Sequence, residues 1–300
     1  MRKILLLGKD GQVGHELQRS LALLGELNSQ GRQADGGLVA DLSQPDALLE
    51  LVRRLRPDVI VNAAAYTAVD KAESDEAMAT QVNAGTPGLL AEEAARLGAW
   101  LVHYSTDYVF DGSGEQARDE QAAPAPLSVY GRSKLASEEL IRASGCKHLI
   151  FRTSWVHSGH GGNFVRSILK LAAQREQLNV VADQIGAPTG ADLLADVTAH
   201  ALRQALRQPE LAGMYHLSAA GHTSWHGFAR FIVEQALARG QDLRLRPEAI
   251  APIPSSGYPT PARRPLNSRL DCSKLMRSFD LNLPPWQQGA LRTLQQLLPN

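Results

Sequence analysis

The chain has 300 residues, 44% of them hydrophobic, and its 31 basic and 31 acidic side chains cancel. This length suffices for one large or two moderate domains, and the hydrophobic content argues against disorder. The balanced charge, with no long block of one sign, excludes the electrostatic footprint of a nucleic-acid or membrane-surface binder, so we expect a small-molecule partner.

The first predicted element is a strand, "KILLLG". Its apolar run ends at Gly8 and is shorter than the roughly 7 to 15 residues of a signal peptide. No later apolar stretch approaches the roughly 18 residues of a membrane span. Cys146 and Cys272 fit neither a metal spacing nor a disulfide framework. We therefore expect a cytoplasmic protein with two buried, inert thiols.

Helix-like and strand-like patterns then alternate along the chain. An amphipathic helix follows the first strand, and a helix that starts at Pro45 leads through "DALLELVRRLR" to the strand "PDVIVNAAA". The same order repeats in "LLAEEAARLG" and "AWLVHYST", in the Tyr130 helix and "KHLIFRTSW", and in "NFVRSILKLAAQR" and "LNVVADQ". Nearly continuous apolar strands between helices predict a doubly wound α/β fold, with a parallel sheet covered on both faces.

Two segments depart from this alternation. Residues 111–127, "DGSGEQARDEQAAPAPL", predict a long loop, which is typical of a lid or binding loop and equally of a solvated insertion. After Trp155 the order is less regular, and prolines gather in "APIPSSGYPTPARRPLNSRL". We expect one domain over 1–154, joined by about 176–220, and a smaller α/β domain over most of 155–300.

Three glycines lie between the first strand and its helix. Gly8, Gly11 and Gly14 have the spacing G-x-x-G-x-x-G in "LLLGKDGQVGHEL". A glycine in the turn permits a tight bend, a second lets the backbone approach a pyrophosphate at the helix N-terminus, and a third permits close helix-to-strand packing. The pattern predicts a Rossmann-type dinucleotide site in the first domain, and a merely tight turn is the alternative.

The region after the glycines bears on which dinucleotide binds. Such sites often carry an acidic residue that selects NAD, whereas this chain has Arg32 near that position. Arg32 is suited to the 2′-phosphate of NADPH, although a surface arginine in a polar loop is an ordinary finding. We expect NADPH or NADH, and we place Asp41 and Leu42 at the next strand end, flanking the adenine.

Tyr130 and Lys134 project from one helix face at i and i+4 in "VYGRSKLASEE". A lysine ammonium, together with a nicotinamide cation, would favour the phenolate and lower the pKa of the tyrosine. The tyrosine would then donate a proton to a carbonyl oxygen during ketone reduction. An exposed pair without function is the alternative for this common spacing.

Two strand ends support the catalytic interpretation. Ser105, Thr106 and Asp107 end one predicted strand, at the edge where doubly wound sheets bind ligands. A hydroxyl there can contact both the substrate carbonyl and the tyrosine oxygen. Ala63, Ala64 and Ala65 end the preceding strand with side chains small enough to admit a cofactor.

With these motifs the chain resembles the extended short-chain dehydrogenase/reductase family, and the likeness covers almost the whole sequence, through "RPDVIVNAAAYTAVDKAES", "GAWLVHYSTDYVFDG", "DQIGAPTGADLLAD" and "YPTPARRPLNSRLD". The resemblance implies reduction of the carbon-4 ketone of dTDP-4-dehydro-L-rhamnose to dTDP-L-rhamnose, a homodimer, and a product used for cell-surface polysaccharides such as lipopolysaccharide. It implies a catalytic triad of Thr106, Tyr130 and Lys134, and sugar contacts from Thr106, Asp107 and Trp155. It also implies a cofactor lining of Gly11, Gln12, Val13, Asp41, Leu42, Ala65, Tyr66, Thr67 and Tyr104.

Some expectations are left open by the residues. Magnesium binding in some members of the family would map to Glu16 and Asp192, which are otherwise ordinary solvated carboxylates. Asn163 and Phe164 could contact the nucleotide, or serve in capping and packing. Arg264 could pair with the pyrophosphate, and the neighbouring Arg263 is a competing candidate.

Two other functions are considered. A nucleotide-sugar epimerase or dehydratase would retain its cofactor, but dehydratases typically have Asp-Glu after the threonine, and here Asp107 is followed by Tyr108. A non-catalytic regulatory subunit would sense the dinucleotide without turnover, but it would not need Tyr130 and Lys134.

Overall fold

The computed structural model describes residues 1–32 and 39–298. A six-stranded sheet has the order β10-β5-β4-β3-β1-β2, and each neighbouring pair is parallel. The strands are β1 (Lys3–Leu7), β2 (Glu26–Gln30), β3 (Val59–Asn62), β4 (Trp100–Thr106), β5 (Lys147–Thr153) and β10 (Gly213–His216). The order reverses between β1 and β3, which is where a doubly wound sheet opens a crevice for a ligand.

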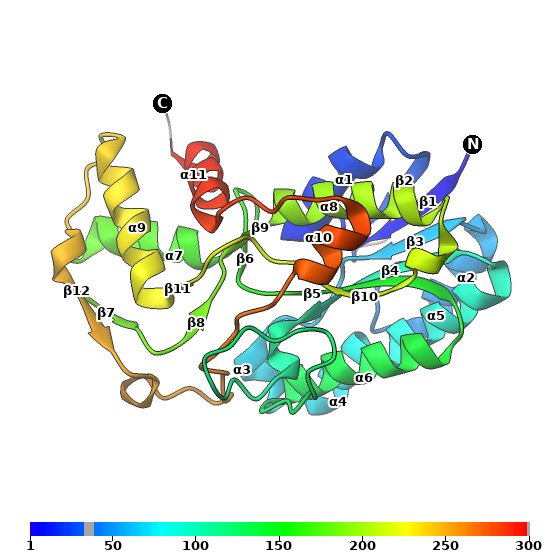
Figure 1. Cartoon of the computed structure of the whole chain (residues 1–300), viewed down its shortest axis with the longest axis horizontal. Coiled ribbons are helices and arrows are strands. Elements are labelled where there is room, and N and C mark those ends of the chain that lie inside the picture. Colours follow the sequence, from blue (N-terminus) through cyan, green and yellow to red (C-terminus); the bar gives the residue numbers. More distant parts are fainter. Residues whose placement is uncertain (33–38, 299–300) are drawn as a thin grey trace.

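Helices cover both faces of this sheet (Figure 1). Helices α1 (Gln12–Leu21), α8 (Ala191–Ala205) and α10 (Ser273–Phe279) pack on one face. Helices α2 (Pro45–Leu55), α5 (Thr86–Leu97) and α6 (Val129–Ala143) pack on the other. Short helices α3 (Val69–Ala72) and α4 (Glu76–Thr80) and a π-helical turn, η1 (Gln81–Gly85), precede α5.

The two cores follow from the period of the strands. Ile4 and Leu6 of β1 belong to the core under α1 and α8, whereas Leu5 and Leu7 belong to the core under α2 and α5. Successive side chains of a strand point to opposite faces, so a strand buried on both sides is apolar throughout. The predicted doubly wound α/β fold is therefore confirmed.

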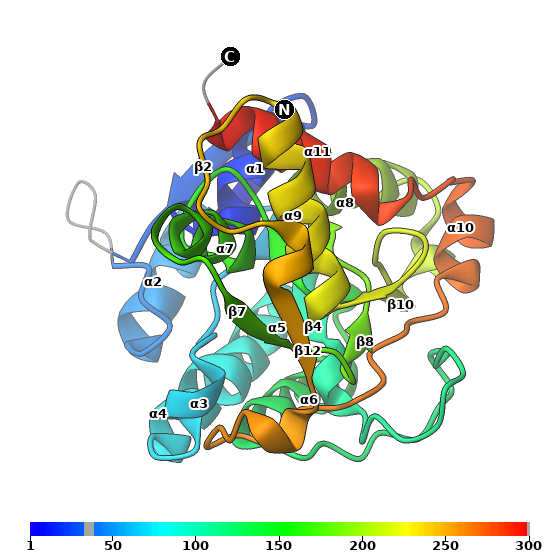
Figure 2. The ribbon, with the colours of Figure 1, turned by 90° about the vertical axis from the view of Figure 1, so that its left-hand side faces the viewer.

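A second group of elements packs around its own core beside the sheet. Helices α7 (Phe164–Gln174), α9 (Trp225–Ala238) and α11 (Trp286–Leu297) surround it, and β7 (Leu178–Val181) pairs with β12 (Ile250–Ile253). Figure 2 views the molecule from this end, with α9 and β12 in front. Two short pairs complete it, β6 (Val156–His157) with β9 (Thr189–Gly190) and β8 (Ile185–Gly186) with β11 (Thr223–Ser224).

The chain after residue 155 contributes to both groups. Helix α8, strand β10 and helix α10 belong to the sheet side, whereas β7 pairs with β12 outside the large sheet. The domain boundaries given above stay a prediction. The remaining short turns are 3-10 helices, η2 (Asp107–Val109), η3 (Pro209–Leu211), η4 (Pro247–Ala249) and η5 (Ser255–Gly257).

One predicted strand end is not found. Residues 39–42 form no strand; instead the carboxylate of Asp41 accepts a hydrogen bond from the Ser43 amide at 2.9 Å, and the Asp41 carbonyl accepts one from Gln44. An aspartate that bonds the backbone two residues on makes a turn, and here the turn leads directly into α2.

Cys146 and Cys272 are both buried free thiols, as predicted. None of the helices in residues 1–32 and 39–298 combines the length and the apolar character that a membrane crossing requires.

Candidate active site

The glycine-rich turn joins β1 to α1. Gly8 has φ +86°, and a Cβ there would lie 2.7 Å from the backbone nitrogen of Ala64. A Cβ at Gly14 would lie 1.9 Å from the carbonyl oxygen of Gly8. These two glycines are required by packing. At Gly11 a Cβ would come within 3.4 Å of that oxygen, and the backbone faces an open cavity.

The cavity has a volume of about 880 Å³ and lies over the carboxyl ends of the sheet strands. Its wall includes most of the predicted cofactor residues, namely Gly8, Gly11, Gln12, Val13, Arg32, Asp41, Leu42, Ala63, Ala64, Ala65, Thr67, Tyr104, Tyr130 and Lys134. Residues that were not predicted as cofactor contacts complete the wall, namely Asp10, Ala40, Val82, Ser105, Thr153, Val156, Gly161 and Gly162. A cavity of this size is adequate for a dinucleotide-sized ligand.

Two predicted cofactor residues lie outside this wall. Gly14 is inside the α1 packing contact described above. Tyr66 donates its hydroxyl to the carboxylate of Asp75 at 3.0 Å, and its amide donates to Asn83 at 2.8 Å. The ring also packs beside the α2 and α5 core. These contacts give Tyr66 a structural role.

Helix α6 presents Tyr130 and Lys134 to the cavity. The helix begins where the Ser128 hydroxyl accepts a hydrogen bond from the Gly131 amide at 3.1 Å. Tyr130 forms a hydrogen bond with Thr106, and the ring of Tyr108 meets its ring edge-on, with centroids 5.8 Å apart. The structure thus brings the three predicted catalytic residues together at the ends of α6 and β4.

Burial governs the titration of this pair. It raises the pKa of Tyr130 to about 12, with the Thr106 hydrogen bond acting in the opposite direction. It lowers the pKa of Lys134 to about 7, although the charge of Glu138 acts to raise it. The expected lowering of the tyrosine pKa is therefore absent from the protein alone, because burial, together with the charge of Asp107, outweighs the Thr106 hydrogen bond.

Asp107 follows Thr106 and is almost completely buried. The Thr106 hydroxyl donates to its Oδ1 at 3.1 Å, whereas Oδ2 has no hydrogen-bond partner among the described residues. Burial raises the pKa of Asp107 to about 6, and a hydrogen bond from Ser268 partly opposes this. A carboxyl group with one unpartnered oxygen thus lies close to Tyr130.

A buried ion pair supports the back of α6. Arg152 of β5 donates to both carboxylate oxygens of Glu138, at 2.8 and 2.6 Å, and the Ser105 hydroxyl donates to Glu138 at 2.5 Å. The side chains of Glu138 and Arg152 are 0% and 3% exposed. Sequence reasoning missed this pair; the signal was a glutamate four residues after Lys134, on the same helix face.

The predicted substrate residues lie outside the cavity wall. Thr106 and Asp107 end β4 of the large sheet, whereas Trp155 and Asn163 lie beside the second core. Trp155 has φ +49°, an unusual conformation for a large residue, and its ring stacks on Trp225 with centroids 3.6 Å apart. Asn163 caps α7 and also donates to Gln12 of the glycine-rich turn at 3.0 Å. Phe164 contacts Trp225, with ring centroids 4.6 Å apart.

Arg264 is engaged with a carboxylate. Its guanidinium donates to the two oxygens of Asp70 at 3.0 and 2.7 Å, so the C-terminal loop is tied to α3. Arg263, the competing candidate, is exposed. A bidentate pair of this kind suits a carboxylate and a phosphate equally.

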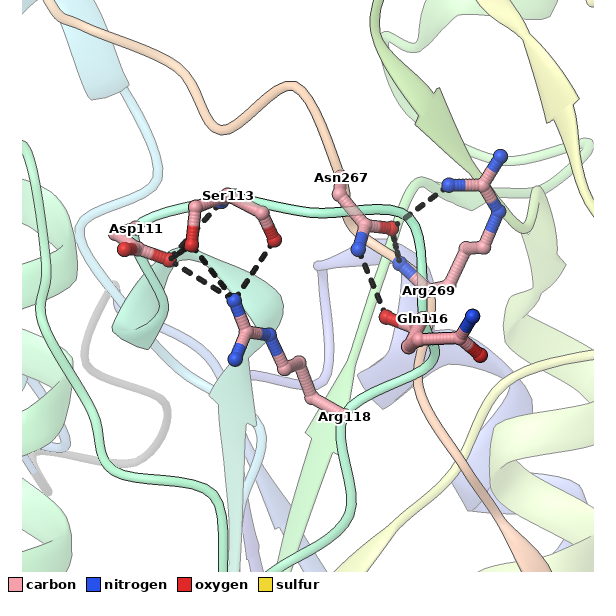
Figure 3. A network of polar contacts seen from close by, with 6 residues as sticks. All are labelled: Asp111, Ser113, Gln116, Arg118, Asn267 and Arg269. Atoms are coloured by element: carbon pink, nitrogen blue, oxygen red, sulfur yellow. Dashed lines mark hydrogen bonds and ion pairs between the residues drawn. The ribbon is translucent and has the colours of Figure 1, made fainter.

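The predicted loop 111–127 is tied to the C-terminal segment (Figure 3). Arg118 donates to Asp111 and to the carbonyl oxygen of Ser113, at 3.3 and 2.7 Å. Asn267 donates to the carbonyl of Gln116 at 2.8 Å, and backbone bonds join Arg118 to residues 269 and 271. Closure of this loop over a substrate stays a prediction.

The predicted magnesium ligands have basic partners. Arg292 lies 3.2 Å from the carboxylate of Asp192, and Arg19 lies 3.9 Å from that of Glu16. In the part of the chain that the structure describes, no group of three or more His, Cys, Asp or Glu side chains is placed to hold a metal ion. The geometry gives the magnesium prediction no support.

Comparisons with known proteins agree with this geometry. Residues 1–298 match the family described as the RmlD substrate binding domain. The chain is 52% identical to the dTDP-4-dehydrorhamnose reductase of Salmonella typhimurium, over 98% of this chain and 97% of that protein.

Two solved structures are similar over nearly their full length. The dTDP-4-dehydrorhamnose reductase of Clostridium acetobutylicum has a TM-score of 0.87 at 31% identity and covers 98% of this chain and 99% of its own. The enzyme of the same name from Bacillus anthracis, solved in complex with NADP, has a TM-score of 0.85 at 32% identity, with the same coverage.

Proposed function

The chain belongs to the RmlD substrate binding domain family, and from this premise we propose that it is an NAD(P)H-dependent dTDP-4-dehydrorhamnose reductase. It reduces the carbon-4 ketone of dTDP-4-dehydro-L-rhamnose to the alcohol of dTDP-L-rhamnose. One observation carries the proposal: Tyr130 and Lys134 face the same cavity as the open backbone of Gly11.

The residues present fit a dinucleotide. The turn at Gly11 leaves room for a pyrophosphate at the N-terminus of α1. At the neighbouring strand end, Ala63, Ala64 and Ala65 have side chains small enough to admit the cofactor. Arg32 lies in the cavity wall, where a guanidinium suits a 2′-phosphate and thus favours NADPH. When bound, the reduced nicotinamide supplies the hydride.

The protein's own residues supply the proton that the new alcohol needs. Tyr130 donates its hydroxyl proton to the carbonyl oxygen as that oxygen becomes an alkoxide, and Thr106 holds the tyrosine oxygen in place. Lys134, as an ammonium ion, favours the phenolate that Tyr130 becomes. Because burial raises the pKa of Tyr130 to about 12, the hydroxyl keeps its proton until a base as strong as the alkoxide forms.

Substrate contacts are proposed beside the cavity. Asp107 and Trp155 contact the sugar, Asn163 the nucleotide, and Arg264 the pyrophosphate. In the protein alone Arg264 is held by Asp70, so binding of a phosphate there requires this ion pair to open or to be shared.

Other expectations continue as proposals. A homodimer and use of the product in cell-surface polysaccharides follow from the resemblance, and a cytoplasmic location stays a proposal from the sequence. Two arginines already pair with the carboxylates proposed for magnesium, so we propose that turnover does not depend on that ion.

The test follows the near-ultraviolet absorbance of NADPH, or separately NADH, mixed with the protein and dTDP-4-dehydro-L-rhamnose. Stoichiometric oxidation with dTDP-rhamnose as product is expected, faster with NADPH. Y130F should abolish turnover while dinucleotide affinity stays within about twofold of wild type. Binding without net oxidation would favour a cofactor-retaining epimerase or dehydratase, or a regulatory subunit, over the reductase.

A further inference from the structure

Lys134 has an unexpected neighbour. Lys134 is only 2% exposed and His103 only 1%. The side-chain nitrogen of Lys134 lies 3.0 Å from Nε2 of His103. His103 lies on β4, directly under the cavity wall formed by Tyr104 and Ser105. Neither the glycine motif nor the tyrosine and lysine pattern points to this histidine.

Asn62 of β3 determines which nitrogen of His103 carries the hydrogen. The Asn62 Oδ1 accepts a hydrogen bond from the Ala64 amide at 3.1 Å, which orients the side chain. Its Nδ2 therefore faces Nδ1 of His103, at 3.2 Å. An amide NH₂ group can only donate, so Nδ1 must accept, and the ring hydrogen is on Nε2.

Ser137 is consistent with the same tautomer. Its hydroxyl donates to the carbonyl oxygen of Lys134 at 2.6 Å. Because its single hydrogen is used there, the hydroxyl oxygen acts as an acceptor toward Nε2 of His103, which lies 3.1 Å away. The Nε2 hydrogen therefore points toward two possible acceptors, the hydroxyl oxygen of Ser137 and the side-chain nitrogen of Lys134. An ammonium group has no lone pair with which to accept such a hydrogen, whereas a free amine has one.

We propose that His103, fixed as its Nε2–H tautomer by Asn62, is a positioning residue that donates a hydrogen bond to Lys134 and holds it as a free amine in the cofactor-free enzyme. The proposal rests on the proposed reductase function, in which Lys134 acts as an ammonium ion beside Tyr130. His103 would thereby set the pH at which the lysine gains its proton.

The groups that face Lys134 agree with this assignment. On α6, Tyr130 is neutral, and the charge of Glu138 is matched by Arg152 of β5. On β4, burial holds the pKa of His103 well below its ordinary value, so the imidazole is neutral. Burial also lowers the pKa of Lys134 to about 7, which a hydrogen bond to its free amine would reinforce.

The first experiment reads the tautomer in the wild-type protein without cofactor or substrate. Histidine is labelled with nitrogen-15, and the His103 signal in a long-range proton–nitrogen correlation spectrum is assigned by its loss in H103Q. Between about pH 8 and about pH 9, where Lys134 is a free amine, the ring should be neutral with its hydrogen on Nε2. A hydrogen on Nδ1, or a cationic ring, overturns the proposal.

The second experiment measures kcat/KM for the reduction against pH. The wild-type value should fall as the pH rises through the pKa of Lys134, because the ammonium form is lost. In H103Q the amide can turn its oxygen toward Lys134 and accept a hydrogen bond from the ammonium form, which the Nε2–H of the histidine cannot do, so the midpoint should move upward by about one pH unit. A uniform loss of rate with an unmoved midpoint would assign His103 to packing alone and overturn the proposal.

Two further variants keep the test decisive if H103Q folds poorly. N62D offers a carboxylate to Nδ1 and should move the ring hydrogen there, a change that the nitrogen spectrum detects; an unchanged tautomer overturns the role of Asn62. H157Q is the matched control, because His157 is equally buried and lies 2.9 Å from Thr293 instead of near Lys134. It should leave the midpoint in place. Absent turnover in the wild type would refute the reductase proposal, while the spectrum still tests His103.

Discussion

Alanine at Gly14 and alanine at Gly11 should separate the packing demand from the ligand demand of the glycine-rich turn. A Cβ at position 14 would lie 1.9 Å from the carbonyl oxygen of Gly8, a backbone atom that cannot move without its strand. Overpacking costs roughly 1–3 kcal/mol, so G14A should lose about 2 kcal/mol or more of its free energy of unfolding. At position 11 the same oxygen is 3.4 Å away and φ is −80°, so G11A should change stability by about 0.5 kcal/mol at most.

The ligand responds in the opposite order. The methyl group of G11A would stand where we place the pyrophosphate, so the Kd for NADPH should rise about tenfold, equivalent to ~1.4 kcal/mol. Urea unfolding gives the stabilities, and quenching of tryptophan fluorescence by NADPH gives the affinities. If G11A folds normally and binds NADPH as tightly as wild type, the cofactor does not approach this turn. If G14A is as stable as wild type, the packing argument is wrong.

Three other predictions address burial and charge. E138Q leaves the Arg152 guanidinium buried without its carboxylate and should cost about 3 kcal/mol or more in urea unfolding, whereas replacing both residues by methionine should cost less. Burial raises the pKa of Asp107 to about 6, so the folded protein binds more protons than the unfolded chain between about pH 4 and about pH 6. Asp107 should therefore contribute a fall of ~3 kcal/mol in the unfolding free energy as the pH rises through that window, measured by urea unfolding as the difference between wild type and D107N at each pH. A chelator should leave turnover unchanged, because Arg292 already pairs with Asp192; a loss restored by magnesium would contradict this.

The fold could be predicted from the sequence because local patterns determine it. Apolar strands between amphipathic helices indicated the doubly wound sheet, and Pro45 marked the first residue of α2. The strand end placed at Asp41 and Leu42 was wrong, because an aspartate that bonds the backbone ahead of it forms a turn that apolar periodicity does not reveal. The pairing of β7 with β12 joins segments some seventy positions apart, and no local pattern encodes it.

The sequence likewise predicted some residues of the site and not others. Motif spacing brought Thr106, Tyr130 and Lys134 to one place, since strand ends and helix faces have fixed geometry. The partners behind them were not predictable, because His103 and Glu138 read as ordinary residues of an apolar strand and a charged helix. Their roles depend on which side chains the tertiary structure places opposite them, and a single sequence does not record that choice.

Strand β1 shows how tightly this fold fixes the length of one segment. It lies between β2 and β3, its alternate side chains belong to separate cores, and it ends at the Gly8 contact with Ala64. Deleting or inserting a single residue within it would reverse the faces of every side chain beyond that point and displace the turn at the same time. Substitutions of similar volume should be common in natural variants of this strand, and changes of its length should be almost unknown.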